Sequence, residues 1–336
     1  MREQIARGVL KPGDRLPSFS EMRDLYEAAP LTVDRMYALL EQDGLVVREP
    51  RRGVFVAQRV RQQTIGVIAP SGVEPGRQSD PFYMKVLGGI QQAAFAAEHE
   101  VLLLHHDAAI RWEKIDGLLL VGTSTAEFRK KLPPQLTGVS LLYPVDGMAN
   151  VLADDFGGAE KATRHLIEQG HRRIACLSNP HHRLTQLRIA GYQSALREAG
   201  ITPPAKWLHE LKHSSVAGEL REQGYFNMRH WIETTWRDLN CTALLTQNDW
   251  VAAGAMTALK EAGLRMPEDV SVVGFDSLSI CDFMTPALSS IEVPLHEIGV
   301  AGVELLLRQM EKGEESDEKV VLPSRLHLRQ STTSPN

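Results

Sequence analysis

The stretch LLTQNDWVAAGAMTALKEAGLRMPEDVSVVGFDS, residues 244–277, decides the fold of most of the chain. Residues 243–245 are a short apolar run that predicts a buried strand, and Asn248 and Asp249 follow it directly. Apolar residues then recur at helical spacing up to Gly263, which ends the predicted helix. A second strand follows at residues 270–273 and leads into Asp276. The stretch therefore predicts one strand–helix–strand unit.

Consecutive strands joined by a helix are expected to be parallel, with a right-handed crossover. In open parallel sheets, ligands bind outside the carboxyl ends of the strands. Asn248, Asp249 and Asp276 all fall at such ends. Their short oxygen-bearing side chains suit a neutral polyhydroxylated ligand, because each can exchange hydrogen bonds with hydroxyls. The alternative is structural: Asp249 caps the helix and Asp276 lies in a turn.

The pattern ND…A.GAM.AL.EAGLR.PEDVSVVGFD resembles the sensor domain of the lactose/galactose-repressor (LacI/GalR) family, which is similar to periplasmic sugar-binding proteins. The resemblance implies an α/β domain of two lobes, each a parallel sheet flanked by helices, with an effector between them. Arg188, in the pattern R..GY, stands where the family has an arginine that donates to ligand oxygens. The further effector residues that it implies are Asp80, Phe82, Tyr83 and Asp155.

Each of these candidate effector residues also has a purely structural interpretation that involves no ligand. Asp154 and Asp155 stand at a predicted helix start, where an acid is equally suited to capping. Phe82 fits the core between a helix and a sheet as well as it fits a sugar ring, so Tyr83 is the better candidate for exposure. Arg188 could be an ordinary arginine on a helix surface.

The first 57 residues predict a small unit of a different kind. Ser18 and Glu21 have the spacing of a capping box, and Pro30 suits the first position of the next helix. Residues 45–57 then read as two short strands around a tip at residues 49–53. Three helices followed by a β-hairpin make a winged helix-turn-helix, which places one helix in a DNA major groove and the hairpin along the backbone.

The segments GVLKPGDRLPS, TVDRMYALLEQDGLV and RRGVFVA closely resemble the winged-helix DNA-binding domains of the gluconate-repressor (GntR) family. Ala29 and Pro30 replace a hydroxyl residue and an arginine that are usual before the recognition helix, and Asp34 places an acid near DNA phosphates. We therefore expect weak or unusual operator affinity. The predicted DNA-contacting residues are Arg15, Ser20, Thr32, Arg35, Arg51, Arg52 and Gly53.

Composition limits the remaining possibilities. The chain of 336 residues carries a formal net charge of −5, with a mild basic bias in its first 64 residues. No apolar run is long enough to span a bilayer and the N-terminus has no secretory pattern, so we expect a cytoplasmic protein without a membrane partner. Three scattered cysteines and the pair His105 and His106 lack metal-ligand spacing. We expect no metal, no cofactor and no catalytic residues.

The complete prediction is a winged helix-turn-helix at 1–57, a linker at 58–64 and an effector-binding and dimerisation domain at 65–336. Lobe 1 is expected at about 65–169 and 293–322, and lobe 2 at about 170–292 and 323–336. Only the segment AAIRWEK separates the strands predicted at VLLLHHD, residues 101–107, and IDGLLLVG, residues 115–122. This edge of lobe 1, and with it the dimer surface, could therefore be irregular.

The function that fits is a homodimeric transcriptional regulator, a repressor, whose affinity for operator DNA is controlled by a small effector such as a sugar. The alternative is a cytoplasmic sugar-binding protein with a degenerate DNA-binding head. A glycosidase would need two carboxylates at a defined separation, and it is disfavoured because the acids stand among neutral donors.

Overall fold

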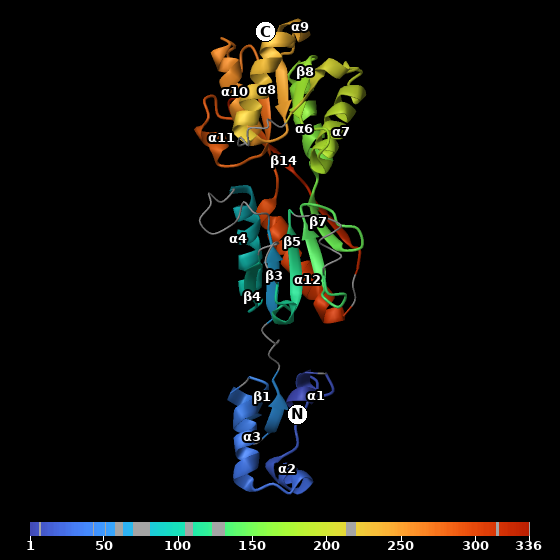
Figure 1. Cartoon of the computed structure of the whole chain (residues 1–336), viewed down its shortest axis with the longest axis vertical. Coiled ribbons are helices and arrows are strands. Elements are labelled where there is room, and N and C mark those ends of the chain that lie inside the picture. Colours follow the sequence, from blue (N-terminus) through green and yellow to red (C-terminus); the bar gives the residue numbers. More distant parts are fainter. Residues whose placement is uncertain are drawn as a thin grey trace. The chain divides into compact units, whose positions relative to one another are not determined.

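The computed structural model describes residues 1–6, 8–42, 44–50, 52–57, 63–69, 81–104, 110–122, 132–212, 220–313 and 316–335. The chain divides into two compact units, Met1–Gln63 and Thr64–Asn336, and each is described by itself. The first unit is the head and the second is the sensor (Figure 1).

The head is a three-helix unit with a β-hairpin. Its elements are α1 (Arg2–Ala6), α2 (Phe19–Tyr26), α3 (Pro30–Gln42), β1 (Val46–Glu49) and β2 (Gly53–Val56). The predicted capping box is present: Ser18 accepts from the Glu21 amide, and Glu21 accepts from the Ser18 amide. Leu16, Val33, Tyr37 and Val54 are among the side chains that form its core. The winged helix-turn-helix is therefore confirmed.

Lobe 1 of the sensor is built on a six-stranded sheet in the order β13-β7-β6-β5-β3-β4, with every strand pair parallel. Helices α4 (Pro81–Ala96) and α12 (Leu295–Lys312) pack against each other beside this sheet (Figure 1). The strands are β3 (Thr64–Ile68), β4 (Glu100–Leu104), β5 (Gly117–Val121), β6 (Gly138–Leu141), β7 (Ala149–Ala153) and β13 (Lys319–Leu322).

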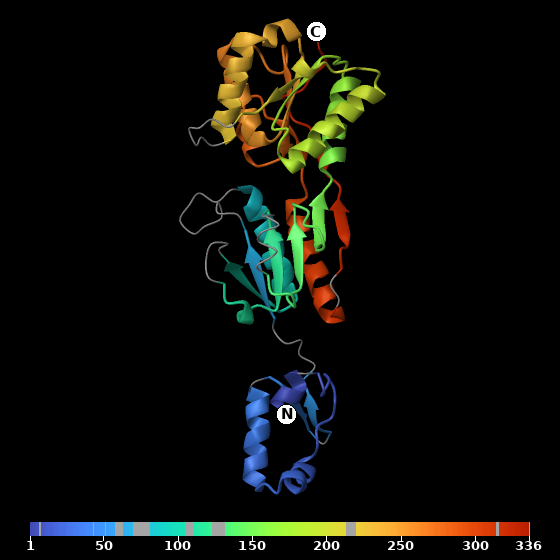
Figure 2. The ribbon, with the colours of Figure 1, turned by 45° about the vertical axis from the view of Figure 1, so that its right-hand side comes forward.

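Lobe 2 is built on a second six-stranded sheet in the order β14-β12-β11-β10-β8-β9, parallel except for the β12–β14 pair. Figure 2 shows the two sheets as separate bodies of the sensor. The strands are β8 (Ile174–Ser178), β9 (Leu208–Glu210), β10 (Ala243–Thr246), β11 (Ser271–Asp276), β12 (Ser289–Glu292) and β14 (Arg325–His327). The helices are α6 (Asp155–Glu168), α7 (Arg183–Glu198), α8 (Leu220–Thr234), α9 (Trp236–Leu239), α10 (Asp249–Glu261) and α11 (Ile280–Phe283).

Three segments join the lobes: β7 to α6, β12 to α12, and β13 to β14. The first crossing differs from the predicted boundary near residue 169, because α6 packs on α7 and on strands of the second sheet. Lobe 1 therefore ends at about residue 154. The periodicity of α6 shows that it is amphipathic, but it does not show which of two sheets the apolar face covers.

The predicted short crossover between β4 and β5 is present. Residues 105–109 lie outside the described part, and residues 110–116 contain only a turn of 3₁₀ helix, Trp112–Lys114. Leu102 and Leu103 on the edge strand β4 are 39% and 45% exposed. Both side chains on this edge strand are thus partly open to solvent.

Candidate functional site

A buried arginine forms the centre of the candidate effector site. The Arg188 Nε atom donates to Asp155 Oδ1 over 2.7 Å, and Nη2 donates to Asp276 Oδ1 over 3.5 Å. A third donor, Nη1, bonds the carbonyl oxygen of Gln247. Arg188 lies on α7, Asp155 is the first residue of α6, and Asp276 ends β11. Three βα units thus converge at the carboxyl ends of the strands, where ligands bind in such folds.

Burial and charge balance both act on this cluster. Arg188, Asp155 and Asp276 are 9%, 3% and 6% exposed, and the guanidinium carbon lies 3.7 Å from the centre of the Phe275 ring. Burial lowers the pKa of Arg188, but the charges of Asp155 and Asp276 outweigh it, so the pKa is raised and the guanidinium stays charged. The Arg188 guanidinium is therefore a permanently charged hydrogen-bond donor whose orientation is fixed by its partners.

The two acids at the start of α6 have different roles. Asp154 Oδ1 accepts from the Gly157 amide at 2.8 Å and caps the helix, which leaves Asp155 to bind Arg188. The sequence could not separate these roles, because both positions suit a carboxylate.

Lobe 1 contributes aromatic side chains to the same region. Tyr143 follows β6, and its pKa is raised, first by burial and then by the charges of Asp155 and Asp276, while Arg188 opposes the shift. The Phe82 and Tyr83 rings, at the start of α4, make an edge-to-face pair with centres 5.2 Å apart. Both are half-buried, and both pack against the core of the sensor. The two interpretations of Phe82 therefore stay open.

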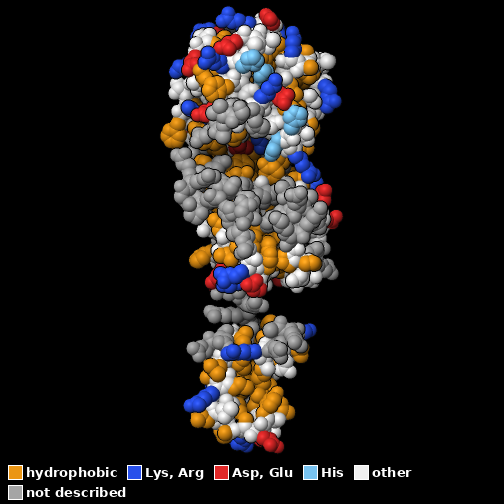
Figure 3. Space-filling view, viewed as in Figure 1, with side chains coloured by type: hydrophobic (Ala, Val, Ile, Leu, Met, Phe, Trp, Pro, Cys, Tyr) orange, Lys and Arg blue, Asp and Glu red, His pale blue; other side chains and the backbone are white. Residues whose placement is uncertain are grey.

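Contacts between the lobes surround the cluster. The Tyr143 hydroxyl lies 3.3 Å from His182 Nε2, and Arg183 Nη1 donates to the Pro144 carbonyl oxygen at 3.3 Å. Lys85 Nζ on α4 donates to the Ser277 carbonyl oxygen at 3.4 Å. Figure 3 shows acidic and basic side chains deep in a recess between the lobes. A ligand there would touch both lobes and would compete with these contacts.

The prediction that Asp249 faces the crevice is wrong. Asp249 is fully buried: its Oδ2 accepts from the Leu278 amide at 2.7 Å, and its Oδ1 accepts from Ser290 Oγ at 2.5 Å. It lies under Gly274, where an added Cβ would come within 2.3 Å of Oδ1. Burial raises the pKa of Asp249 to about 6, against the lowering effect of these hydrogen bonds. Asp249 holds the loop after β11 in place rather than contacting a ligand.

Asn248 caps α10, since its Oδ1 accepts from the Val251 amide at 2.9 Å. Its side chain is half-buried, so a role toward a ligand stays a prediction. Asp80 lies outside the described residues.

The head carries a second candidate site, an interface for nucleic acid. Ser20 on α2 and Thr32 and Arg35 on α3 are exposed. Thr32 and Arg35 also border a pocket of about 640 Å³ whose other lining residues are mostly apolar, among them Met22, Met36 and Leu39. The predicted contacts on α3 thus stand beside an apolar surface.

The tip of the wing is described except for Arg51, which lies outside the described residues. Arg52 is exposed and pairs with Glu49 at 2.5 Å. Gly53 has φ of +123°, and the Arg15 Nε atom lies 3.1 Å from where its Cβ would be, so Arg15 and the wing lie together. Asp34 is paired as well: Arg48 binds it at 3.0 Å and also binds Glu41 at 3.0 Å. Arg48 reduces the repulsion of phosphate that was expected from Asp34 alone.

The comparisons with known proteins agree with this geometry. Residues 163–332 match the model of the periplasmic binding protein-like domain, and residues 1–56 match that of bacterial regulatory proteins of the gntR family. The chain is 30% identical to the HTH-type transcriptional repressor CytR of Escherichia coli, over 82% of this chain and 81% of that protein. The chain belongs to the family of transcriptional regulators with a periplasmic-binding-protein-like domain.

Other members of this family show the same relationship. The ribose operon repressor of Escherichia coli is 29% identical, over 69% of this chain and 72% of the repressor. A LacI family regulator from Enterococcus faecium, solved with bound ribose, is 25% identical and superposes with a TM-score of 0.66, over 81% of this chain and 99% of that one. This regulator therefore combines a GntR-type head with a LacI-type sensor.

Three contributors to the site of this regulator were missed from the sequence. Tyr143, His182 and Gln247 follow strands β6, β8 and β10. Because ligands bind beyond the carboxyl ends of parallel strands, these positions could have been found from the sequence. Among the described residues, no group of three or more metal-ligand side chains comes together. No helix in the described ranges has the length and apolar character needed to cross a membrane.

Proposed function

We propose that this regulator is a repressor whose effector is a small polyhydroxylated molecule, a sugar or a close relative, held by Arg188 and Asp276. The convergence of Arg188, Asp155 and Asp276 beneath Tyr143 of lobe 1 carries the proposal. Carboxylate acceptors next to a fixed guanidinium suit neighbouring hydroxyls, which donate to the acids and accept from the arginine. The ribose bound to the Enterococcus faecium relative is a ligand of this class.

The site binds a ligand without chemical turnover. Glycoside hydrolysis requires an acid and a second carboxylate on opposite sides of the scissile bond. Here Asp155 and Asp276 both bind the same guanidinium, so neither is placed to act as a general acid. We therefore infer that this chain is not an enzyme.

Effector binding controls DNA binding through the relative position of the lobes. The three crossings form a hinge, and the Tyr143–His182, Arg183–Pro144 and Lys85–Ser277 contacts bridge the lobes beside the ligand. A homodimer would present two heads to a two-fold operator, so a change in lobe position alters their spacing. Typical couplings of this kind are about 1–3 kcal/mol, or roughly 5- to 150-fold in operator affinity.

The test uses the full chain in two steps. A thermal-shift panel of pentoses, hexoses, sugar acids and nucleosides first finds a ligand, which stabilises the protein by about 2.7 kcal/mol at one hundred times its Kd. A gel shift on genomic fragments, with and without that ligand and at several salt concentrations, then measures operator affinity. We expect a ligand-dependent change of at least about fivefold. DNA binding that no stabilising ligand alters would refute the proposal.

The same gel shift decides between this function and a sugar-binding protein with a degenerate head. The pairs Arg52–Glu49 and Arg48–Asp34 engage two of the head's cations, which favours modest affinity. Ligand binding without any DNA complex at low salt would support the degenerate head.

A further inference from the structure

The loop between β11 and β12, residues 277–288, begins directly after Asp276 and contains α11. The chain enters it through two residues in the left-handed region of backbone conformation, since Asp276 has a φ of +102° and Ser277 a φ of +48°. Residues other than glycine keep such a conformation only where the surrounding structure holds it. The same conformation directs the Asp276 side chain, which contacts Arg188. The groups that hold the loop therefore help to place Asp276 in the effector site.

One side chain, that of Arg329, contacts this loop at its start, its middle and its end. Nη2 donates to Ser277 Oγ at 3.2 Å, Nε donates to Asp282 Oδ1 at 2.6 Å, and Nη1 donates to the Leu288 carbonyl oxygen at 2.8 Å. The Arg329 side chain is 9% exposed, so water competes little for these bonds. A planar guanidinium presents its donors in fixed directions, which a lysine ammonium does not.

Two other side chains hold backbone amides of the same loop. The Ser277 amide donates to Ser290 Oγ at 3.1 Å, and the Leu278 amide donates to Asp249 Oδ2 at 2.7 Å. Asp249→Asn keeps an oxygen acceptor for the Leu278 amide, so this variant leaves the loop in place. Arg329 has a different effect, because it joins the start of the loop to its end.

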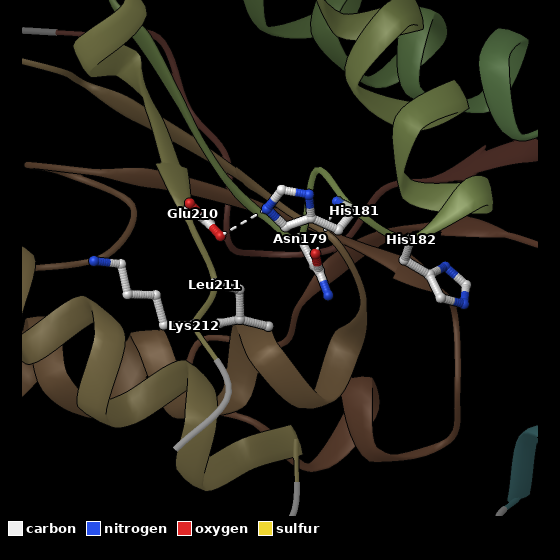
Figure 4. A pocket seen from close by; sticks show the side chains of 6 residues that line it. All are labelled: Asn179, His181, His182, Glu210, Leu211 and Lys212. Atoms are coloured by element: carbon white, nitrogen blue, oxygen red, sulfur yellow. Dashed lines mark hydrogen bonds and ion pairs between the residues drawn. The ribbon is translucent and has the colours of Figure 1, made fainter. Parts of the chain in front are cut away.

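The side chains at the other end of this strand edge are held less firmly. Figure 4 shows His181, after β8, reaching toward Glu210 at the end of β9, where His181 Nε2 lies 3.0 Å from Glu210 Oε1. These two side chains are 77% and 45% exposed. Exposed ion pairs add little to stability, because water screens them. Of the two sets of contacts, those of Arg329 are therefore the stronger restraint.

The tail that carries Arg329 comes directly from the third crossing between the lobes. There β14 pairs antiparallel with β12, and the Arg329 amide donates to Ser289 Oγ at 2.9 Å. From lobe 1, Lys85 Nζ donates to the Ser277 carbonyl oxygen at 3.4 Å. Ser277 is thus held by the tail through its hydroxyl and by lobe 1 through its carbonyl.

We propose that Arg329 is a positioning residue of the effector site. It holds the loop at residues 277–288 so that Asp276 stands beside Arg188, and it acts on the effector through Asp276. This inference rests on the proposed function, because it takes Asp276 as a group that binds the effector. Effector affinity, and not only the stability of lobe 2, then depends on the Arg329 guanidinium.

Isothermal titration of the full chain tests the inference. The probe is whichever of ribose, arabinose, glucose, gluconate or cytidine stabilises the chain most in the thermal-shift panel. Arg329→Lys keeps the charge but cannot bond all three points of the loop, so it should lower the affinity about tenfold, as for one lost hydrogen bond to a charged group. Ser277→Ala removes only the acceptor at the start of the loop and should lower it about threefold. Unchanged affinity in both variants would overturn the inference.

A double substitution shows whether Arg329 acts through Asp276. If it does, the variant with both Arg329→Lys and Asp276→Asn should bind within about twofold of Asp276→Asn alone. Independent losses would instead multiply to about a hundredfold and would overturn the positioning role.

His171→Asn is the matched control for a structural effect of the tail. His171 Nε2 lies 2.9 Å from the Thr333 carbonyl oxygen and 3.2 Å from Oγ of Ser271, the first residue of β11. It thus binds the same tail at the opposite end of the strand from Asp276. The control should lower the melting temperature and leave the affinity within about twofold. A loss of affinity equal to that of Arg329→Lys would overturn the inference.

Hydrogen exchange of residues 277–288 gives a readout that needs no ligand. Arg329→Lys should speed exchange of the Ser277 and Leu278 amides about tenfold, because their protection depends on the loop staying in place. Unchanged exchange would overturn the inference. Faster exchange without binding of any probe would refute the proposed function, and with it the effector role of Arg329, while its anchoring of the loop would stand.

Discussion

Replacing Arg188 by methionine is the substitution with the largest expected effect on stability. It removes the guanidinium from between Asp155 and Asp276 and leaves two carboxylates that are 3% and 6% exposed without their cation. Breaking a buried ion pair in this way costs about 3–5 kcal/mol. At about 2–4 °C per kcal/mol for a domain of this size, the melting temperature should fall by about 10 °C at pH 7.5.

The assay is thermal unfolding of the full chain, followed by circular dichroism at pH 7.5 and at pH 5. The deficit of Arg188→Met should shrink at the lower pH, because buried carboxylates without a partner take up protons readily. Arg164→Met is the control: Arg164 pairs with Glu198 at 2.9 Å, but both side chains are about half exposed, so the loss should stay below about 1 kcal/mol. Equal melting temperatures for the two variants would refute the buried cluster.

Three further predictions follow from buried groups and from the head. Burial raises the pKa of Asp249 from its ordinary 3.8 to about 6. The free energy of unfolding should therefore fall by up to about 3 kcal/mol as the pH rises from 4 to 6. In urea unfolding, the Asp249→Asn variant should lack this fall in stability with pH. An alanine Cβ at Gly89 would lie 2.0 Å from the His296 carbonyl oxygen, whereas a Cβ at Gly88 would meet open space. Gly89→Ala should therefore cost about 1–3 kcal/mol of stability, and Gly88→Ala should be neutral or stabilising. Equal melting temperatures for the two variants would contradict this packing. Arg35→Ala should reduce the slope of the logarithm of operator affinity against the logarithm of salt concentration by about one. An unchanged slope in the gel shift would exclude a contact between Arg35 and a DNA phosphate.

Much of the fold was predictable because its signals are local. The capping box at Ser18 and the helix start at Pro30 depend on residues within one turn, and both are present. The strand–helix–strand unit around α10 was predicted from the helical spacing of its apolar residues and from the glycine that ends the helix. Both signals lie within a short stretch of sequence. The boundary at α6 was wrong because the choice between two sheets depends on contacts that are distant in sequence.

The site shows the same division. Asp276 and Asp249 were both predicted to face the ligand because both follow strands. Asp276 contacts Arg188, whereas Asp249 is buried beneath Gly274. The strand-end rule gives the edge of the sheet and not the direction of the side chain, so it cannot separate them. The contact between Tyr143 and His182 joins two lobes, and no local pattern encodes it.

Titration of a ligand from the thermal-shift panel into Asp276→Asn and Asp249→Asn tests the account most directly. Asp276 contacts Arg188 at the carboxyl edge, while Asp249 is fully buried. The account predicts that Asp276→Asn loses about tenfold or more in affinity and that Asp249→Asn stays close to the unmodified chain. Strong loss in Asp249→Asn with normal binding by Asp276→Asn would contradict it.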